Sequence, residues 1–184
     1  MRFSAGKLAK MGMFVALAIV LKLPILSIPN VEFFTFMVFS AGFLFGIIEG
    51  AIVGGLSMSV YTTFNPYGLA PLPIAFSQIF CMILIGLLGG IAFKSNIICR
   101  DPSGSRTDLK ISPYWVMGAL AIVLTLIYDL VTNLAVAYTL GSFIPVMVAG
   151  IPFSLIHILS NLAIFVVLTP VLFKLAQKER NSRP

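Results

Sequence analysis

Polar side chains are scarce in this sequence, and those that interrupt its apolar stretches recur at helical spacing. Asp129 and Asn133 are four residues apart, and so are His157 and Asn161 in a later stretch. A spacing of four places two side chains on one face of a helix. A carboxylate, an imidazole and two amides on neighbouring helices predict either a pocket for a small polar ligand or hydrogen bonds that only join the helices.

Further polar and aromatic candidates lie at or near the ends of apolar stretches. Their types suit a planar or heterocyclic solute that stacks on aromatic rings and makes a few hydrogen bonds. Glu32 has two interpretations, because it either caps the helix that follows it or contacts a ligand. The predicted substrate-binding set is Asn30, Glu32, Tyr61, Asn65, Tyr67, Gln78, Asp129, Asn133, His157 and Asn161.

Catalysis by this chain is not expected. Ser154, His157 and Asp129 are a nominal Ser/His/Asp set, but Ser154 lacks the Gly-x-Ser-x-Gly elbow of a serine hydrolase. A single histidine without paired carboxylates argues against a metal site. The chain also has no phosphate-binding loop of the Gly-x-x-x-x-Gly-Lys type, so we expect no ATP hydrolysis by it. We therefore predict no enzyme activity, no catalytic residues, no metal and no cofactor.

The elements that position these residues must be membrane helices. Of the 184 residues, 59% are hydrophobic and only 10% are charged, which excludes a soluble domain and a disordered chain. The stretch 33–64 would form a helix of roughly 48 Å, too long for a hydrocarbon core of about 30 Å, so it is predicted to be two helices joined by a turn near 46–50. The predicted spans are about 8–27, 33–47, 50–63, 71–93, 114–138 and 151–175.

The basic residues indicate the orientation of these spans. Eleven of the twelve Lys and Arg residues fall at or before the start of the first span, in a basic loop at 94–111, or at the end of the last span and in the tail after it. The positive-inside rule places all three groups in the cytoplasm, which requires an even number of spans between them. Lys22 is the exception, and its long stem is expected to snorkel at the outer face. The outer loops are predicted at 27–32, 62–70 and 139–150.

The predicted fold is therefore an all-α membrane protein, a six-transmembrane-helix bundle with both termini cytoplasmic. It is expected to form a single integral domain over residues 1–184 and to be a multi-pass protein of the cell membrane. The net charge of +6 is interpreted as cytoplasmic anchoring and not as a nucleic-acid surface.

Small residues recur along two stretches of the chain. The first set forms one stripe on the first helix, where another helix could approach closely; it serves either docking of a partner or internal packing. The second set crosses the turn near 46–50 and is expected to pack inside the chain. The first set is Ala5, Ala9, Gly12 and Ala16, and the second is Gly42, Gly46, Gly50 and Gly54.

Together these features resemble the substrate-binding S component of an energy-coupling factor transporter. The resemblance rests on the size, the six spans with basic ends, the first-helix stripe, the glycine-rich join at 42–50, the segment 65–68 and the segment from Gly150 to Asn161. It implies binding of a vitamin or vitamin precursor near the outer surface, between the fourth to sixth helices. It also implies docking of the stripe on a transmembrane coupling subunit that two cytosolic ATPase subunits drive.

Two other functions stay open at this point. Asp129 and His157 would suit a stand-alone proton-coupled carrier or channel for a small solute. The stripe alone would suit a membrane assembly protein that binds a partner and no small molecule.

Overall fold

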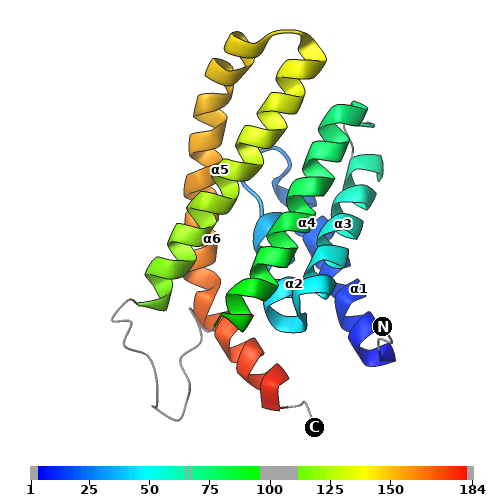
Figure 1. Cartoon of the computed structure of the whole chain (residues 1–184), viewed down its shortest axis with the longest axis vertical. Coiled ribbons are helices and arrows are strands. Elements are labelled where there is room, and N and C mark those ends of the chain that lie inside the picture. The colour runs from blue at the N-terminus through cyan, green and yellow to red at the C-terminus, as the bar shows by residue number, and fades with distance from the viewer. Residues whose placement is uncertain (1–3, 65, 67, 96–111, 182–184) are drawn as a thin grey trace.

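The computed structural model describes residues 4–64, 66, 68–95 and 112–181, and every element within those ranges is helical. The elements are α1 (Ala5–Val20), a short 3₁₀ helix η1 (Leu23–Ile25), α2 (Phe34–Phe45), α3 (Ile47–Phe64), α4 (Leu72–Lys94), α5 (Pro113–Leu140) and α6 (Phe143–Asn181). Figure 1 shows α5 and α6 as a long antiparallel hairpin beside α3 and α4, with both chain ends toward the same end of the bundle. The predicted all-α class is confirmed.

Five helical segments of the described chain are long and apolar enough to cross a bilayer. They are Ala5–Ile25, Ile47–Phe64, Leu72–Lys94, Pro113–Leu140 and Phe143–Asn181. The sixth apolar helix, α2, has 12 residues and a length of about 18 Å, shorter than a hydrocarbon core of about 30 Å. Six complete crossings and cytoplasmic termini therefore stay predictions. Most of the predicted basic loop 94–111 lies outside the described residues.

The predicted break between the second and third helices is confirmed, and it is sharper than expected. α2 ends at Phe45 and α3 starts at Ile47, so Gly46 alone separates them. Gly46 has a φ of 127°, a backbone conformation that only glycine adopts without strain. The third helix therefore begins at residue 47 and not near residue 50.

The predicted outer loop at 139–150 is wrong. α5 continues to Leu140 and α6 starts at Phe143, which leaves a two-residue join. Gly141 ends α5 in the left-handed conformation, with a φ of 65°. Pro145 signalled a loop in the sequence, but it lies in the first turn of α6, where its missing N–H has no helical partner to lose.

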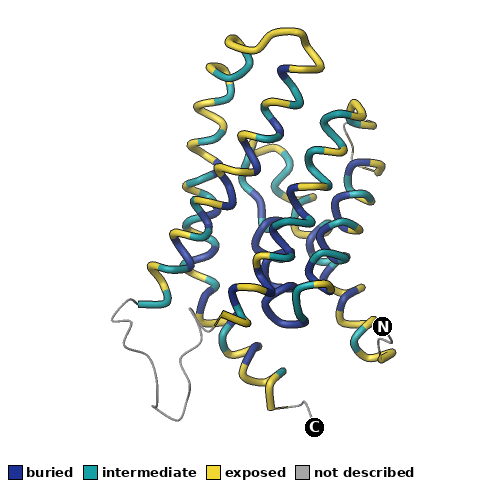
Figure 2. Tube along the Cα trace, viewed as in Figure 1, coloured by how far each residue is buried: buried dark blue, intermediate teal, exposed yellow. Residues whose placement is uncertain are grey.

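The core centres on α2, whose residues are all buried except Met37 (Figure 2). A helix that is apolar on every side is expected to be surrounded by other elements. Its aromatic side chains meet those of α6, where the ring centroids of Phe36 and Phe165 are 5.2 Å apart in an edge-to-face contact. α2 therefore fills the middle of the bundle. Its position also fixes the position of residues 21–33, the segment that precedes it.

The second glycine set packs inside the chain, as expected. A Cβ added to Gly42 or Gly50 would overlap the carbonyl oxygen of Gly86, and one added to Gly54 would overlap that of Met82. Three helices, α2, α3 and α4, thus meet backbone to backbone, which only glycine permits.

The first small-residue stripe, on α1, lies on an exposed surface, in contrast to the buried second set. Ala5, Ala9, Gly12 and Ala16 are all exposed, and a Cβ added to Gly12 would meet no atom within 4 Å. The other face of α1 is buried through Met11, Phe14 and Ala18. Internal packing therefore does not explain this stripe within the described chain.

Candidate functional site

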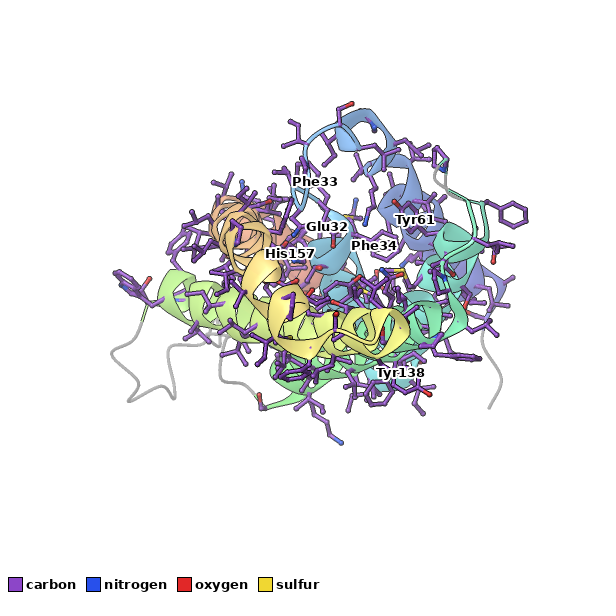
Figure 3. All side chains as sticks on the ribbon, turned by 90° about the horizontal axis from the view of Figure 1, so that it is seen from above. Glu32, Phe33, Phe34, Tyr61, Tyr138 and His157 are labelled. Atoms are coloured by element: carbon purple, nitrogen blue, oxygen red, sulfur yellow. The ribbon has the colours of Figure 1, made fainter. Side chains whose placement is uncertain are left out.

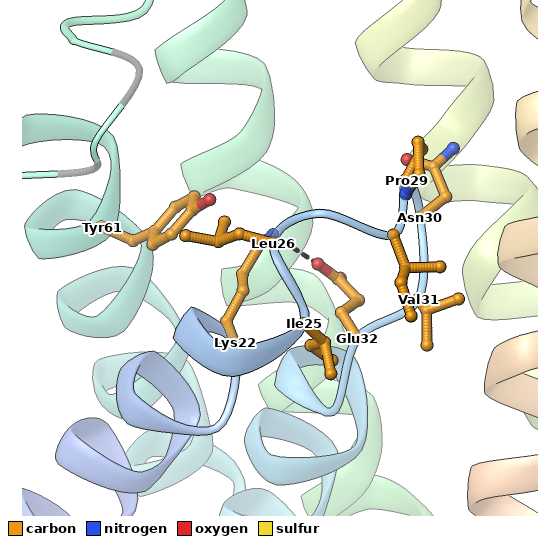
Figure 4. A pocket seen from close by; sticks show the side chains of 9 residues that line it. Lys22, Ile25, Leu26, Pro29, Asn30, Val31, Glu32 and Tyr61 are labelled. Carbon is orange, nitrogen blue, oxygen red and sulfur yellow. Dashed lines mark hydrogen bonds and ion pairs between the residues drawn. The ribbon is translucent and has the colours of Figure 1, made fainter.

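A hollow of about 300 Å³ lies against the segment that joins α1 to α2 (Figure 4). This segment folds as η1 followed by a turn, and Asn30 in the turn takes a positive φ of 58°. The side-chain amide of Asn30 donates to the carbonyl oxygen of Phe153 on α6, at 2.9 Å. The hollow is lined by Lys22, Ile25, Leu26, Ile28, Pro29, Asn30, Val31, Glu32 and Tyr61.

The charged pair at this hollow is Lys22 and Glu32. The Lys22 ammonium donates to Oε2 of Glu32 and also lies over two aromatic rings, 4.4 Å from the centroid of Tyr61 and 5.5 Å from that of Phe34. Both side chains are largely shielded, with exposed fractions of 17% for Lys22 and 6% for Glu32. A pair shielded to this extent requires both partners, because removal of one leaves a buried charge.

Glu32 connects this pair to two of the long helices. Its Oε1 accepts from the hydroxyl of Thr35 at 3.3 Å and lies 3.5 Å from Nε2 of His157 on α6. Nδ1 of His157 lies 2.7 Å from Oδ1 of Asp129 on α5. Figure 3 shows Glu32 and His157 next to each other. Lys22, Glu32, His157 and Asp129 thus form a row of ionisable groups, called here the charge chain.

The electrostatics of the charge chain favour an ionised Glu32. Burial by itself raises the pKa of the Glu32 carboxyl, but the charge and hydrogen bond of Lys22 and the contact with His157 outweigh it and hold this pKa well below its usual value. The interpretation of Glu32 as a helix cap is wrong. Phe33 is the N-cap residue of α2, and no side-chain hydrogen bond caps that end.

The helices α5 and α6 meet through polar groups as well as apolar ones. Nδ2 of Asn161 donates to the hydroxyl of Thr125 at 3.0 Å, and the rings of Tyr128 and His157 meet edge to face with their centroids 5.7 Å apart. Oδ2 of Asp129 and Oδ1 of Asn161 are buried and have no hydrogen-bond partner within the described residues. This surface joins the two helices and still leaves acceptors unused.

The structure gathers some of the predicted site residues and separates others. Asn30, Glu32 and Tyr61 line the hollow, and His157 and Asp129 reach it through the charge chain. The hollow therefore lies against the segment 21–33 and α3, and not between the fourth to sixth helices. Whether these residues bind substrate stays a prediction.

The remaining predicted residues lie elsewhere or are not described. Asn161 contacts Thr125, deeper along α6. Asn133 packs against Gly150, and Gln78 is half-buried on α4; neither lines the hollow. Asn65 and Tyr67 lie outside the described residues.

Sequence reasoning missed Lys22, which it interpreted as a snorkelling side chain. One signal was present, because Lys22 is the one Lys or Arg outside the three basic groups. A single cation in an apolar stretch, ten residues before an acid, indicates an ion pair better than an anchor.

These features define a class, that of multi-pass helical membrane proteins with a solute-sized hollow lined by a few charged and aromatic groups. The family model of the substrate-specific component of ECF transporters matches residues 6–173, and the chain belongs to this family. It is therefore a substrate-specific transporter subunit and not an enzyme. Searches of curated proteins and of solved structures give no match.

Proposed function

We propose that this chain captures a vitamin or vitamin precursor for an energy-coupling factor importer and holds it at the hollow beside residues 21–33. The observation that carries the proposal is the charge chain, which runs from Asp129 on α5 through His157 and Glu32 to Lys22 at the hollow. Charged groups inside a membrane protein are costly, and their convergence on a hollow favours a binding role over a purely structural one.

The delivery half of the proposal rests on the exposed stripe of α1. Ala5, Ala9, Gly12 and Ala16 would receive a helix of a transmembrane coupling subunit, which two cytosolic ATPase subunits would drive. Small residues let the two backbones approach closely. The ion pair between Lys7 and the buried Glu49 on α3 supports this arrangement, since it fixes the inner end of α1 while the stripe stays exposed. The chain would lie in the cell membrane with six crossings and cytoplasmic termini.

Thermal denaturation of the detergent-solubilised protein with a panel of vitamins and precursors tests the capture step. A ligand that binds only the folded state raises the melting temperature in proportion to its saturation. We expect at least one panel member to do so, and Tyr61→Ala to weaken that shift. Val167→Ala, at an exposed position on α6, is the control. If the panel produces no shift, the proposed function is wrong.

A second candidate is a proton-coupled carrier that works alone. The observation in its favour is the buried contact of 2.7 Å between His157 and Asp129, a pair of groups that could exchange a proton. Uptake into proteoliposomes that contain this chain alone, compared with proteoliposomes that also contain the coupling and ATPase subunits, separates the two functions. Uptake that a proton ionophore abolishes would support the carrier, and uptake that needs the coupling and ATPase subunits with ATP would support the importer.

A further inference from the structure

Lys22 occupies the end of the charge chain that faces the hollow. Glu32 also lines the hollow but is less exposed, and its carboxylate is contacted by the Lys22 ammonium, the Thr35 hydroxyl and the His157 ring. A carboxylate has about four lone-pair sites; the Lys22 ammonium and the Thr35 hydroxyl use two of them, and the His157 ring faces Oε1 at 3.5 Å. Glu32 is therefore positioned to hold Lys22 and His157, and a ligand in the hollow meets the ammonium first.

The exposed fractions of the two side chains also indicate that a ligand in the hollow meets Lys22 before Glu32. The Lys22 side chain has an exposed fraction of 17%, against 6% for Glu32. An ammonium has three N–H donors, and one of them serves Glu32. The two aromatic rings near Lys22 attract its charge through their faces but accept no ordinary hydrogen bond from it. Lys22 thus retains donors for an acceptor that enters the hollow.

The other groups of the charge chain also leave a positive charge at its Lys22 end. His157 lies between two carboxylates, and an imidazolium would have one N–H for each of them. Glu32 is then shared by two cations, Lys22 and His157, so it neutralises Lys22 only in part. The end of the charge chain that lies at the hollow is therefore positive.

From this geometry we infer that the ligand is a small organic anion whose carboxylate binds the Lys22 ammonium. The rest of the molecule would lie against the ring of Tyr61 and the aliphatic side chains of Ile25, Leu26 and Val31, which line the same hollow. The inference rests on the proposed function and adds the chemical class of the substrate. It makes Lys22 the residue that selects for charge.

The first experiment compares matched acids and uncharged analogues. Thermal shift and calorimetric titration of the purified full-length protein would use nicotinate with nicotinamide, pantothenate with panthenol, biotin with biotin amide, and thiamine as a cation. We expect a member of the acid set to bind and its uncharged partner to bind about 10- to 100-fold more weakly. That loss is the value of one hydrogen bond between charged groups.

Three variants then assign the effect to Lys22. Lys22→Met should remove the preference for the acid. Because this change leaves Glu32 unpaired, the double variant Lys22→Met/Glu32→Gln removes both charges of the pair. We expect it to fold and also to fail to distinguish acid from amide. Glu32→Gln alone removes the competing anion and should tighten binding of the acid. Lys10→Met, which removes an exposed ion pair with Glu179, is the matched control and should change nothing.

Three results would overturn the inference, and they separate it from the proposed function. If an uncharged ligand or thiamine binds while the acids do not, the protein is still a capture subunit and the anion class is wrong. The same holds if Glu32→Gln abolishes binding, because the ligand would then contact the carboxylate. If no member of any charge binds, the proposed function and the inference both fail.

Discussion

Nδ1 of His157 on α6 lies 2.7 Å from Oδ1 of Asp129 on α5, and both side chains are buried. The two residues are 28 positions apart and come together because α5 and α6 run antiparallel from a two-residue turn. The contact joins two helices and at the same time fixes the ring that faces Glu32. Its removal should therefore affect stability and ligand binding together.

Asp129→Ala should destabilise the protein by about 1–3 kcal/mol, because it leaves a buried imidazole N–H without an acceptor. Asp129→Asn keeps an oxygen at the same place and should lose less. Thermal denaturation in detergent measures both, with Asn133→Ala as the control one turn away on α5. Equal melting temperatures for the Ala and Asn variants would contradict the role of the Asp129 oxygen.

Glu32 should make the stability of the protein depend on pH in a defined direction. The pKa of its carboxyl is lower in the folded state than the value of about 4.3 in an unfolded chain. Such a group stabilises the folded state above the unfolded pKa, and the contribution is lost as pH falls through the folded pKa. Glu32→Gln should thus be less stable than the wild type by about 2 kcal/mol at pH 7.

The difference between these two proteins should stay constant from pH 7 to about pH 5 and shrink below about pH 4. Because the two proteins differ only at residue 32, the change in their difference in melting temperature below about pH 5 follows the protonation of Glu32. A difference that grows as the pH falls would show the opposite sign and contradict the ion pair with Lys22.

Asn30 should control how firmly residues 21–33 close over the hollow. It supplies a positive φ and a hydrogen bond to Phe153 on α6. Asn30→Gly keeps the backbone conformation and removes the bond, whereas Asn30→Ala also introduces strain of about 1 kcal/mol or more. We expect ligand dissociation to accelerate in both variants, and more in the Ala variant. Stopped-flow release of a bound ligand measures it, and rates equal to that of the wild type would exclude this anchor.

The glycine contact between α3 and α4 should tolerate no added methyl group. A Cβ on Gly86 would overlap the backbone carbonyl of Gly50, and neither atom belongs to a side chain that could rotate away. Gly86→Ala should lower stability by about 1–3 kcal/mol or more and reduce the folded yield. Gly12→Ala, in open space on α1, is the control and should be neutral or slightly stabilising. Similar losses for both would contradict the packing.

The stripe on α1 should act in assembly and not in capture. Leu at Gly12 and Ala16 places bulk on an exposed surface, so the fold and ligand binding should survive while co-purification with the coupling and ATPase subunits is lost. Val167→Leu, on the exposed surface of α6, is the control. Loss of ligand binding in the stripe variant would indicate a folding defect and contradict this division of roles.

The helices were predictable from sequence because their signals are local. A long apolar run with few charges must be helical in lipid, and Gly46 in such a run marks a break. The same local reasoning failed at Pro145, because a proline in a first helical turn and a proline in a loop look alike in sequence. It also grouped Asn133 with residues that the structure places elsewhere, since spacing along one helix does not say which partner that face meets.

By itself, the sequence determined the helical membrane class, a break near residues 46–50 and the internal packing of the second small-residue set, whereas the exposure of the first set came from the structure. The length of the apolar stretches and the small size of the residues decide those three features, and both can be read from the sequence. Only the tertiary structure decided that Lys22 pairs with Glu32, that Glu32 reaches His157, and that Asn30 is bonded to Phe153, 123 residues away. Such contacts depend on the position of α2 within the bundle, because packing around α2 fixes where residues 21–33, which precede it in the chain, lie against α3 and α6.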